Sequence, residues 1–242
     1  MNKLLDSHML ADANLFVLSM NPYPGRGIVL GMNETGENLI LVYWIMDQNR
    51  FFTFDADGSV STKVADSSKL VDTPPIVYNA MREIHHDGVT FAVVSSGDQT
   101  DAIVEGLGEE RSFTVTHRSC LYEPDAPNFT PRISAYCFWT NSGASVAEMA
   151  VLKKSLVSDA CNRHFYDLTL EPGFGYCVTT YKGDGTPLPS FDGTPYLVPL
   201  RGHIQSIASA YWDSLNSENR VSLVVKFIPK NGPSQVFYIN KF

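Results

Sequence analysis

Apolar and polar residues follow one another in short runs along most of the chain, which is typical of β-strands separated by turns. The turn sequence NETGE joins the first two of these runs. The run NLILVYWIM at 38–46 is apolar almost throughout, so we expect both faces of this strand to be covered. The pattern predicts strands at 28–32, 38–46, 50–54, 133–139, 149–157, 165–170, 175–181, 221–228 and 235–240.

Turn signals also predict which strands form hairpins. In residues 76–96, Asp87-Gly88 supplies the positive-φ turn that hairpins favour. Asn141–Gly143 is the predicted turn between 133–139 and 149–157, and PKNGP is the turn between the last two strands. We further expect 165–170 to pair with 175–181 around the sequence EPGFG.

Helical spacing of apolar residues occurs in few places. After Gly97, the segment DQTDAIVEGLGEE has Asp98 at a suitable N-cap position and apolar residues at helical spacing behind it. Residues 203–216 form the clearest amphipathic helix, and residues 3–19 fit either a short helix or an irregular lead-in. Many hairpins and few helices predict one α+β domain over residues 1–242, with mainly antiparallel sheets.

The charge balance excludes whole classes of partner. The 242 residues include 18 Lys+Arg against 26 Asp+Glu, a formal net charge of −8. Nucleic acids and anionic membranes are bound by a dense basic face, which this composition does not offer. No window approaches the ~20 apolar residues that cross a bilayer, and the N-terminal residues contain no signal-peptide core. We therefore expect a cytoplasmic globular protein.

The cysteine spacing does not predict a metal site, and the common motifs of nucleotide-binding loops and serine hydrolases do not occur in the sequence. Cys120, Cys137, Cys161 and Cys177 show no CxxC or paired His/Cys spacing, so they are expected to be reduced core residues. The sequence also lacks GxSxG, GxxxxGK[ST] and GxGxxG. A serine-hydrolase elbow and the usual nucleotide-binding loops therefore have no support.

Three loops gather polar residues at the ends of predicted strands, namely 21–27, 95–101 and 122–132. In the first, Arg26 stands between two glycines, so the backbone can approach a ligand while the guanidinium reaches an anion. From this segment alone we favour a turn with a solvated arginine. The second loop leads into a helix N-terminus, which can bind an anion, although its two aspartates also suit capping.

The third loop, YEPDAPNFTPR, contains three prolines and cannot be regular structure. Glu123 and Asp125 present two carboxylates, and Asn128, Thr130 and Arg132 add an amide, a hydroxyl and a guanidinium. A rigid loop with these groups suits a polar small molecule. The alternative is an Ω-loop that is hydrogen-bonded internally.

Tyr78 and Asn79 form a polar pair inside an apolar strand. On periodicity alone we favour a buried tyrosine with a satisfied hydroxyl over a catalytic group. The six histidines are scattered, and His85-His86 fall in a predicted hairpin turn, where exposure is favoured over metal ligation.

Read in order, five stretches resemble the archaeal-type IMP cyclohydrolase family and its bacterial relatives. They run from residue 21 to about residue 195 and keep the order of the family. Each alone is a weak signal, and the five together make a specific match. The stretches are NPYPGRGIVLG, PIVYNAMREI, VSSGDQTDAI, EPDAPNFTPRISAY and GFGYCVTTYKGDGTPLPSF.

This resemblance implies a four-layer αββα sandwich of two antiparallel sheets, like that of N-terminal-nucleophile hydrolases. The reaction it implies is the dehydrative closure of 5-formamidoimidazole-4-carboxamide ribotide to IMP in purine biosynthesis. The ligand would be a purine ribotide, and this step needs no metal, folate or redox cofactor.

By motif position, Tyr78 and Glu123 match residues to which the family assigns catalytic roles. We expect Glu123 to handle the proton and Tyr78 to donate to the developing oxyanion. The resemblance and the loop chemistry together assign substrate-binding positions for base, ribose or phosphate. These positions are Arg26, Arg50, Asn79, Ser96, Gly97, Thr100, Asp101, Asn128, Thr130 and Arg132.

One departure from the family pattern lies between residues 46 and 50. Relatives carry a longer loop containing Gly-Arg-Ser before an Asn-Arg pair, whereas here Asp47-Gln48 leads directly to Asn49-Arg50. A small, hydroxyl-rich, cationic loop is a natural phosphate-binding element. Its partial absence would leave more of the anion contact to Arg26 and Arg50. The long loop at 182–195 is a candidate cover for the site.

Two other functions remain open in the sequence. The shortened loop is compatible with a non-catalytic paralog that binds a purine nucleotide without turnover. An amide hydrolase with an N-terminal nucleophile is disfavoured because the chain starts Met1-Asn2. The apolar, hairpin-rich edges are compatible with a homo-oligomer.

Overall fold

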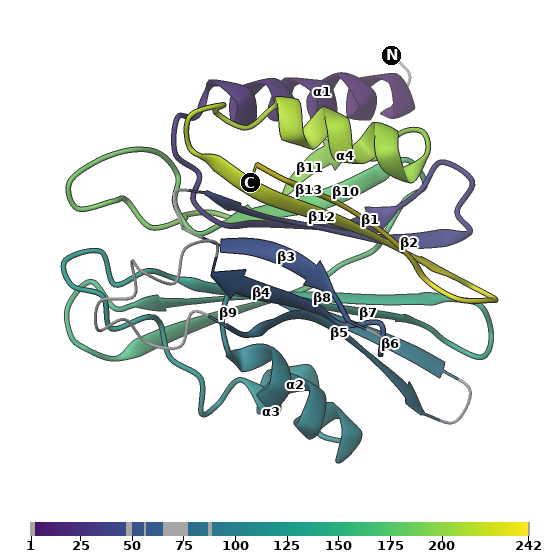
Figure 1. The fold of residues 1–242 in the computed structure, drawn as a ribbon, viewed down its shortest axis with the longest axis horizontal. Helices are drawn as coiled ribbons and strands as arrows, with labels where there is room; N and C mark the ends of the chain where they lie inside the picture. Colours follow the sequence, from purple (N-terminus) through teal and green to yellow (C-terminus); the bar gives the residue numbers. More distant parts are fainter. Residues whose placement is uncertain (1–2, 47–49, 56, 65–76, 87–88, 242) are drawn as a thin grey trace.

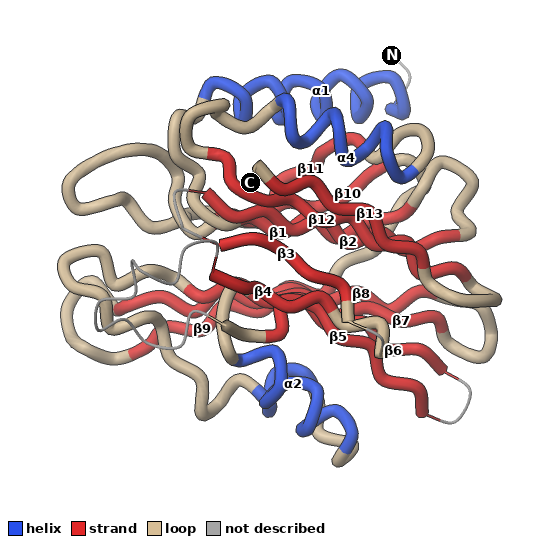
Figure 2. The backbone as a smooth tube through the Cα atoms, viewed as in Figure 1, coloured by secondary structure: helices blue, strands red, loops and turns tan. Residues whose placement is uncertain are grey.

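The computed structural model describes residues 3–46, 50–55, 57–64, 77–86 and 89–241. In this part of the chain two antiparallel sheets lie face to face, accompanied by few helices (Figures 1 and 2). The predicted α+β class with mainly antiparallel sheets is therefore confirmed. The turn at Asp87-Gly88 and the shortened loop at residues 47–49 lie outside the described residues.

The first sheet has six strands in the order β11-β10-β1-β2-β12-β13. Its centre is the predicted all-apolar strand, β2, which hydrogen-bonds to β1 on one side and to β12 on the other. Leu39 to Met46 are all buried, as expected for a strand covered on both faces. The strands are β1 (Gly27–Met32), β2 (Asn38–Met46), β10 (Phe174–Thr179), β11 (Tyr196–Pro199), β12 (Arg220–Pro229) and β13 (Gln235–Asn240).

The second sheet is a seven-stranded meander in which each strand pairs with its neighbours in the sequence. Some of these antiparallel neighbours are joined by a few residues, whereas residues 96–131 form a long connection between two of them. The strands are β3 (Arg50–Phe54), β4 (Val60–Val64), β5 (Asn79–His86), β6 (Val89–Ser95), β7 (Arg132–Trp139), β8 (Ser145–Lys154) and β9 (Cys161–Asp167).

The main hydrophobic core lies between the two sheets, and the helices cover their outer faces. Side chains such as Ile28 and Tyr43 from the first sheet pack against Ala92 and Met149 from the second. Helices α1 (Lys3–Met20) and α4 (Ile204–Asp213) lie on the outer face of the six-stranded sheet (Figure 1). Helices α2 (Gln99–Gly108) and α3 (Phe113–Thr116) lie on the outer face of the other sheet.

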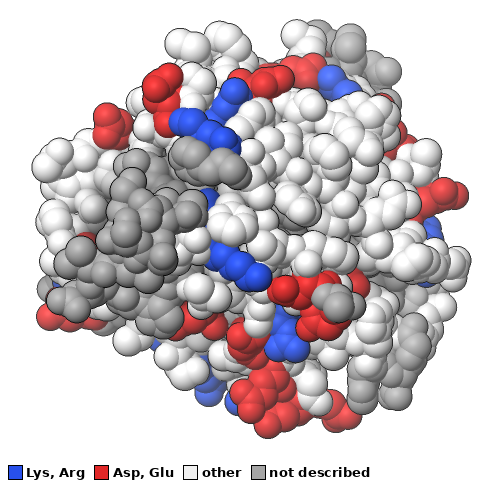
Figure 3. Space-filling model, in the orientation of Figure 1, with Lys and Arg blue, Asp and Glu red and all other residues white. Residues whose placement is uncertain are grey.

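Both predicted amphipathic helices are confirmed as α2 and α4, and the N-terminal segment is a helix rather than an irregular lead-in. All four cysteines are free, and three are buried as expected, while Cys161 is only half-buried. In the described residues, no helix is long and apolar enough to cross a membrane. On the face shown in Figure 3, cations lie scattered among acidic side chains and form no continuous basic surface.

The predicted pairing of 165–170 with 175–181 is wrong. Strand β9 pairs with β8 at the edge of the seven-stranded sheet, whereas β10 pairs with β1 and β11 in the other sheet. The segment between them crosses from one sheet to the other, and adjacency in the sequence does not reveal such a crossing. The strand predicted at 149–157 runs from Ser145 to Lys154 instead.

Candidate active site

The local sequence forces Arg26 into the space between the sheets, at the start of β1. A side chain on Gly25 would meet Thr180 Oγ1 at 2.2 Å, and one on Gly27 would meet the Trp44 ring at 1.9 Å. Gly25 also has a φ of +70°, which favours glycine. The glycines thus let the backbone pass closely while the arginine side chain turns inward. Arg26 is only 4% exposed, so the prediction of a solvated arginine is wrong.

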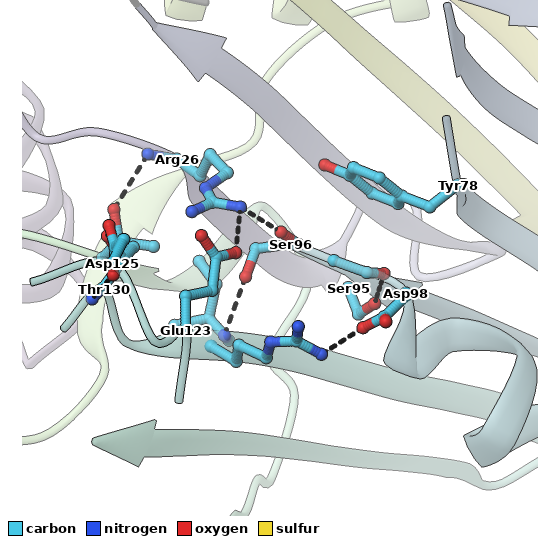
Figure 4. Close-up of polar contacts among 12 residues, drawn as sticks. Arg26, Tyr78, Ser95, Ser96, Asp98, Glu123, Asp125 and Thr130 are labelled. Carbon is cyan, nitrogen blue, oxygen red and sulfur yellow. Dashed lines mark hydrogen bonds and ion pairs between the residues drawn. The ribbon is translucent and has the colours of Figure 1, made fainter. Parts of the chain in front are cut away.

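The Arg26 guanidinium links the three loops that the sequence singled out. Its Nη1 donates to Glu123 Oε1 at 2.7 Å and also to the backbone carbonyl of Ser96 (Figure 4). Burial alone would lower the pKa of Arg26, but the charge and hydrogen bond of Glu123 outweigh burial and raise it. Arg26 is therefore a permanent buried cation that fixes one oxygen of the Glu123 carboxylate.

The loop that carries Glu123 is held by its own hydrogen bonds, as the Ω-loop alternative proposed. Asp125 Oδ1 accepts from the Thr130 backbone N–H at 2.7 Å, and Asp125 Oδ2 accepts from the Thr130 hydroxyl. The Glu123 N–H donates to the Thr130 carbonyl at 2.9 Å. Thr130 Oγ1 also contacts the hydroxyl of Tyr181, which comes from the loop after β10. Asp125 and Thr130 therefore stiffen the loop and aim Glu123 at Arg26.

Tyr78 immediately precedes β5, and its hydroxyl lies 2.7 Å from that of Tyr43 on β2. Tyr78 is 7% exposed, and Tyr43 is completely buried. Burial, together with the neighbouring Tyr78, raises the pKa of Tyr43 well above its ordinary value, so Tyr43 stays protonated. Arg50, the first residue of β3, lies with its Cζ 5.6 Å from the centre of the Tyr78 ring. In Figure 4 the Tyr78 hydroxyl points toward the Arg26 guanidinium.

A cavity of about 150 Å³ opens beside Arg26 and Glu123. Polar groups from the loops at 21–27 and 122–132 and from the segment after β10 converge on it, including Asn128, Thr130 and Thr180. Its lining residues are Tyr23, Gly25, Arg26, Met46, Glu123, Asp125, Asn128, Thr130, Thr180, Tyr181 and Leu188. Four of the predicted site residues therefore share one cavity, and they are Arg26, Glu123, Asn128 and Thr130.

Asn128 connects this cavity to the long loop at 182–195. Its Oδ1 accepts from the Leu188 backbone N–H at 3.0 Å. The loop is further fixed by the Lys182 N–H, which donates to the Pro189 carbonyl at 3.0 Å. A second cavity of about 570 Å³ adjoins the first and shares Tyr23, Asn128 and Leu188 with it. The long loop therefore forms part of the wall around both cavities.

Asn79, Thr100 and Asp101 do not line the first cavity. Asn79 Nδ2 donates to the Asp101 carboxylate at 3.0 and 3.1 Å, and Arg82 Nη1 donates to Asp101 at 2.9 Å. The side chain of Thr100 is completely buried against the Ser95 hydroxyl. These contacts fasten the N-terminal turn of α2 to β5 and β6.

Ser96, Gly97 and Arg132 do not line the first cavity either. Ser96 Oγ accepts from the Ile133 backbone N–H at 3.0 Å, so this hydroxyl joins β7 to the loop. Arg132 Nη1 donates to Asp98 and, at 3.2 Å, to Gln99 Oε1. Asp98 thus pairs with Arg132, and although it occupies the N-cap position of α2, its side chain makes no capping hydrogen bond. The capping role expected for Asp98 is wrong.

The residues that sequence reasoning missed are Tyr43, Thr180 and Tyr181. Thr180 accepts from the Arg26 backbone N–H at 3.1 Å through its hydroxyl, and Tyr181 holds Thr130. Both lie in the stretch GYCVTTY, where two threonines next to a tyrosine after an apolar strand were an available signal. Tyr43 lies inside an apolar strand, and nothing in the sequence sets it apart.

These contacts can support acid–base chemistry on a polar, uncharged group. A carboxylate is held beside a permanent cation, and a hydroxyl pair lies on the other side of that cation. Within the described residues, no group of three or more His, Cys, Asp or Glu side chains is arranged to hold a metal ion.

Comparison with known proteins identifies the family to which this chain belongs. No curated protein matches the chain significantly. A family model described as IMP cyclohydrolase-like protein matches residues 23–232, which include every predicted site residue. The chain belongs to the IMP cyclohydrolase-like family.

Proposed function

We propose that this protein is an IMP cyclohydrolase, which closes 5-formamidoimidazole-4-carboxamide ribotide to IMP with loss of water. The carboxamide nitrogen attacks the formyl carbon and forms the new C–N bond of the ring. The formyl oxygen becomes a hydroxyl and leaves as water, while the formamido nitrogen gives up its proton to form the C=N bond. The observation that carries the proposal is the contact of Arg26 with Glu123 beside Tyr78, in a chain of this family.

Glu123 is the proposed proton carrier. An amide nitrogen is a poor nucleophile, so a base must take its proton as the new bond forms. Arg26 binds Oε1 of this carboxylate, which leaves Oε2 to receive the proton. The loop contacts of Asp125 and Thr130 support this role because they limit the movement of the carboxylate.

Tyr78 is the proposed donor to the developing oxyanion. Its hydroxyl can accept a hydrogen bond from Tyr43, whose protonated state is secured by burial. In that arrangement the proton of Tyr78 is directed away from Tyr43 and is free for the substrate. A single oxyanion donor is worth roughly 10²–10³ in rate.

Arg50 is the proposed binding residue for the phosphate of the ribotide. Within the described residues Arg50 forms no ion pair, whereas Arg26 pairs with Glu123 and Arg132 pairs with Asp98. We also propose that a further set of residues binds the purine ribotide, and of this set Asn128 and Thr130 line the cavity beside Glu123. The set is Asn79, Ser96, Gly97, Thr100, Asp101, Asn128, Thr130 and Arg132.

We also propose the detailed fold type, the domain organisation and the cellular location of this protein. Helices on the outer faces of both sheets support a four-layer αββα sandwich of the N-terminal-nucleophile hydrolase kind. We further propose that residues 1–242 form one domain, that the reaction belongs to purine biosynthesis in the cytoplasm, and that it needs no cofactor.

A second candidate is a paralog that binds a purine nucleotide without turnover. The cavity beside Glu123 measures about 150 Å³, whereas ligand pockets are usually ~300–1,000 Å³. Several site side chains are also paired with each other, as Asn79 is with Asp101. Either ligand would have to widen the cavity, and a purine nucleotide that binds with these side-chain pairs intact would be held without turnover.

Ring closure of the synthetic ribotide, followed by the absorbance of the new hypoxanthine ring, tests the proposal. We expect Glu123→Gln to lower kcat by about 10²–10⁴-fold, because it removes the base. Tyr78→Phe should lower kcat by roughly 10²–10³-fold, because it removes the oxyanion donor. Thermal melts establish that each variant is folded.

Matched controls are Glu171→Gln and Tyr238→Phe, which change the same atoms at exposed positions. Both controls should cyclise at the wild-type rate. Wild-type rates in folded Glu123→Gln and Tyr78→Phe would refute the assigned roles. A wild-type protein that binds IMP but never closes the ring would establish the paralog instead.

A further inference from the structure

We propose that the outward face of α1 is the contact surface between two copies of this chain. Five large apolar side chains on this helix have more than half of their surface exposed. They are Met9 at 65%, Leu10 at 54%, Phe16 at 66%, Val17 at 65% and Met20 at 69%. We call this set, together with the exposed Ala13 among them, the α1 stripe. Soluble proteins rarely expose so many neighbouring apolar groups unless they bind something there.

The opposite face of α1 is firmly seated on the six-stranded sheet. Ala11 and Leu18 are buried, and Leu18 belongs to the core beneath the helix. Asn14 Nδ2 donates to the Leu197 carbonyl of β11 at 2.7 Å. The α1 stripe is therefore a second apolar face on a docked helix. A helix that is apolar on two sides is normally buried on both.

The spacing of the α1 stripe fits pairing with another helix. Met9 and Phe16 are seven residues apart, as are Leu10 and Val17, and Ala13 and Met20. This heptad repeat keeps one seam toward a partner helix. Around a two-fold axis perpendicular to the helices they run antiparallel, so the small Ala13 of one copy faces the bulky Phe16 of the second copy. The surface is thus complementary to itself, as a symmetric dimer requires.

The size of the α1 stripe supports a dimer core. Taking ~200 Å² for a large apolar side chain, the exposed parts amount to on the order of 600 Å². A specific interface buries about 800 Å² on each partner, with a polar rim around an apolar centre. Exposed polar side chains of α1 itself contribute to that rim, and they include Asp6, Asp12 and Ser19.

Charge favours a second copy over a membrane. Surface-bound helices carry Lys and Arg beside their apolar face, but the exposed residues beside the α1 stripe include Asp6 and Asp12. Arg201, the cation paired with Asp12 at 3.0 Å, is already neutralised. The family match begins at residue 23, so α1 precedes it and the proposed reaction leaves this surface unexplained.

Sedimentation equilibrium of the full chain at about 10 μM tests the proposal. We expect the wild type to sediment as a dimer and Phe16→Glu/Val17→Glu to sediment as a monomer, with at least a tenfold weaker association. The matched control, Leu156→Glu/Val157→Glu, adds the same two groups at exposed apolar positions after β8, outside the α1 stripe, and should remain dimeric.

A second variant keeps the test decisive if the double glutamate variant fails to fold. In the antiparallel arrangement Met9 of one copy faces Met20 of the other, so Met9→Cys/Met20→Cys should form a covalent dimer on mild oxidation. A monomeric wild type at 100 μM would overturn the proposal. Wild type that stays monomeric and floats with neutral phosphatidylcholine vesicles would also overturn it, and would identify α1 as a lipid-binding helix.

Discussion

His117 is a buried histidine whose protonation state can be deduced from its neighbours. It is completely buried, and its Nδ1 lies 2.7 Å from the Phe113 carbonyl, which can only accept. Nδ1 therefore carries the proton, and Nε2 accepts from the Ser134 hydroxyl at 2.6 Å. Burial lowers the pKa of His117 to about 4. The folded protein thus holds this imidazole neutral as part of the core.

Stability should consequently fall as the pH drops from about 6.5 to about 4. In this window the unfolded chain takes up a proton on residue 117 and the folded chain does not. The loss reaches about 3 kcal/mol, since one pKa unit corresponds to ~1.4 kcal/mol. It is complete near pH 4, below which both states are protonated.

Urea unfolding of wild type and His117→Asn over this pH range measures the effect. The variant should be less stable at pH 8 but should lose less stability on acidification. His164→Gln changes an exposed histidine and should keep the wild-type slope. Equal slopes for wild type and His117→Asn would contradict the assignment.

At the scale of single residues, the sequence identifies candidate site residues but does not predict their burial or their partners. Arg26 between two glycines was recognisable, but the backbone on either side of it packs against Trp44 of β2 and Thr180 after β10, which the local sequence does not reveal. The partnership of Asp98 with Arg132 depends on the start of β7 lying beside the N-terminus of α2, and no local pattern contains that information. Tyr43 becomes a site residue only because β2 faces Tyr78.

At the scale of elements, the entry into β1 is set by Gly27 packing against Trp44. The Trp44 side chain is completely buried and stacks on Tyr211 of α4 at 6.4 Å. The ring therefore has no free direction in which to move. The position of Arg26, one residue earlier, depends on this contact.

Gly27→Ala should destabilise the protein by about 3 kcal/mol or more, because a Cβ there would lie 1.9 Å from the Trp44 ring. Differential scanning calorimetry should show a Tm lower by many degrees, and ring closure should fail at temperatures where the wild type works. Gly108→Ala is the control, since nothing lies within 4 Å of its Cβ position. An unchanged Tm for Gly27→Ala would show that β1 can shift as a whole.

Elements with strong periodicity were predictable, and weakly patterned ones were not. The faces of α2 and α4 and the apolar run of β2 determine those elements locally. Strand β4, with the sequence VSTKV, is too polar and too short to be recognised without its partner β3. Helix α1 was ambiguous because its apolar residues lie on two sides.

At the scale of the whole molecule, a buried ion pair joins the two sheets, and its acidic member, Glu83, lies in the motif stretch PIVYNAMREI. Lys226 of β12 lies 3.1 Å from Glu83 of β5, and their side chains are 1% and 9% exposed. Lys226 Nζ also donates to the Gly58 carbonyl at 2.9 Å. A charge in such a place is tolerated only while its partner is present.

Lys226→Met should cost about 3–5 kcal/mol, because it leaves Glu83 buried without a cation. Lys226→Met/Glu83→Leu should recover most of this loss, since an apolar pair of similar volume needs no counter-charge. Arg111→Met removes an exposed ion pair with Glu109 and should change stability by less than ~1 kcal/mol. Urea unfolding provides all three values, and a double variant no better than the single one would contradict this account.

The overall architecture was predictable in class but not in strand order. A hairpin such as β7–β8 follows from its local turn, but β6 and β7 of the seven-stranded meander pair across the long connection at residues 96–131. The six-stranded sheet instead joins β1 and β2 to strands from the last third of the chain, and this long-range pairing has no local signal.

This strand order has a consequence for the newly made chain. β2, the most apolar strand, emerges early from the ribosome, but its neighbour β12 is among the last segments to be synthesised. At ~5–20 residues per second, one edge of β2 waits roughly ten to thirty seconds for its partner. The meander between them can form during that interval and cover one face of β2. How long the open edge of β2 stays exposed in the cell therefore depends on the rate of translation. Replacing codons before β12 with slowly translated synonymous codons would lengthen that exposure.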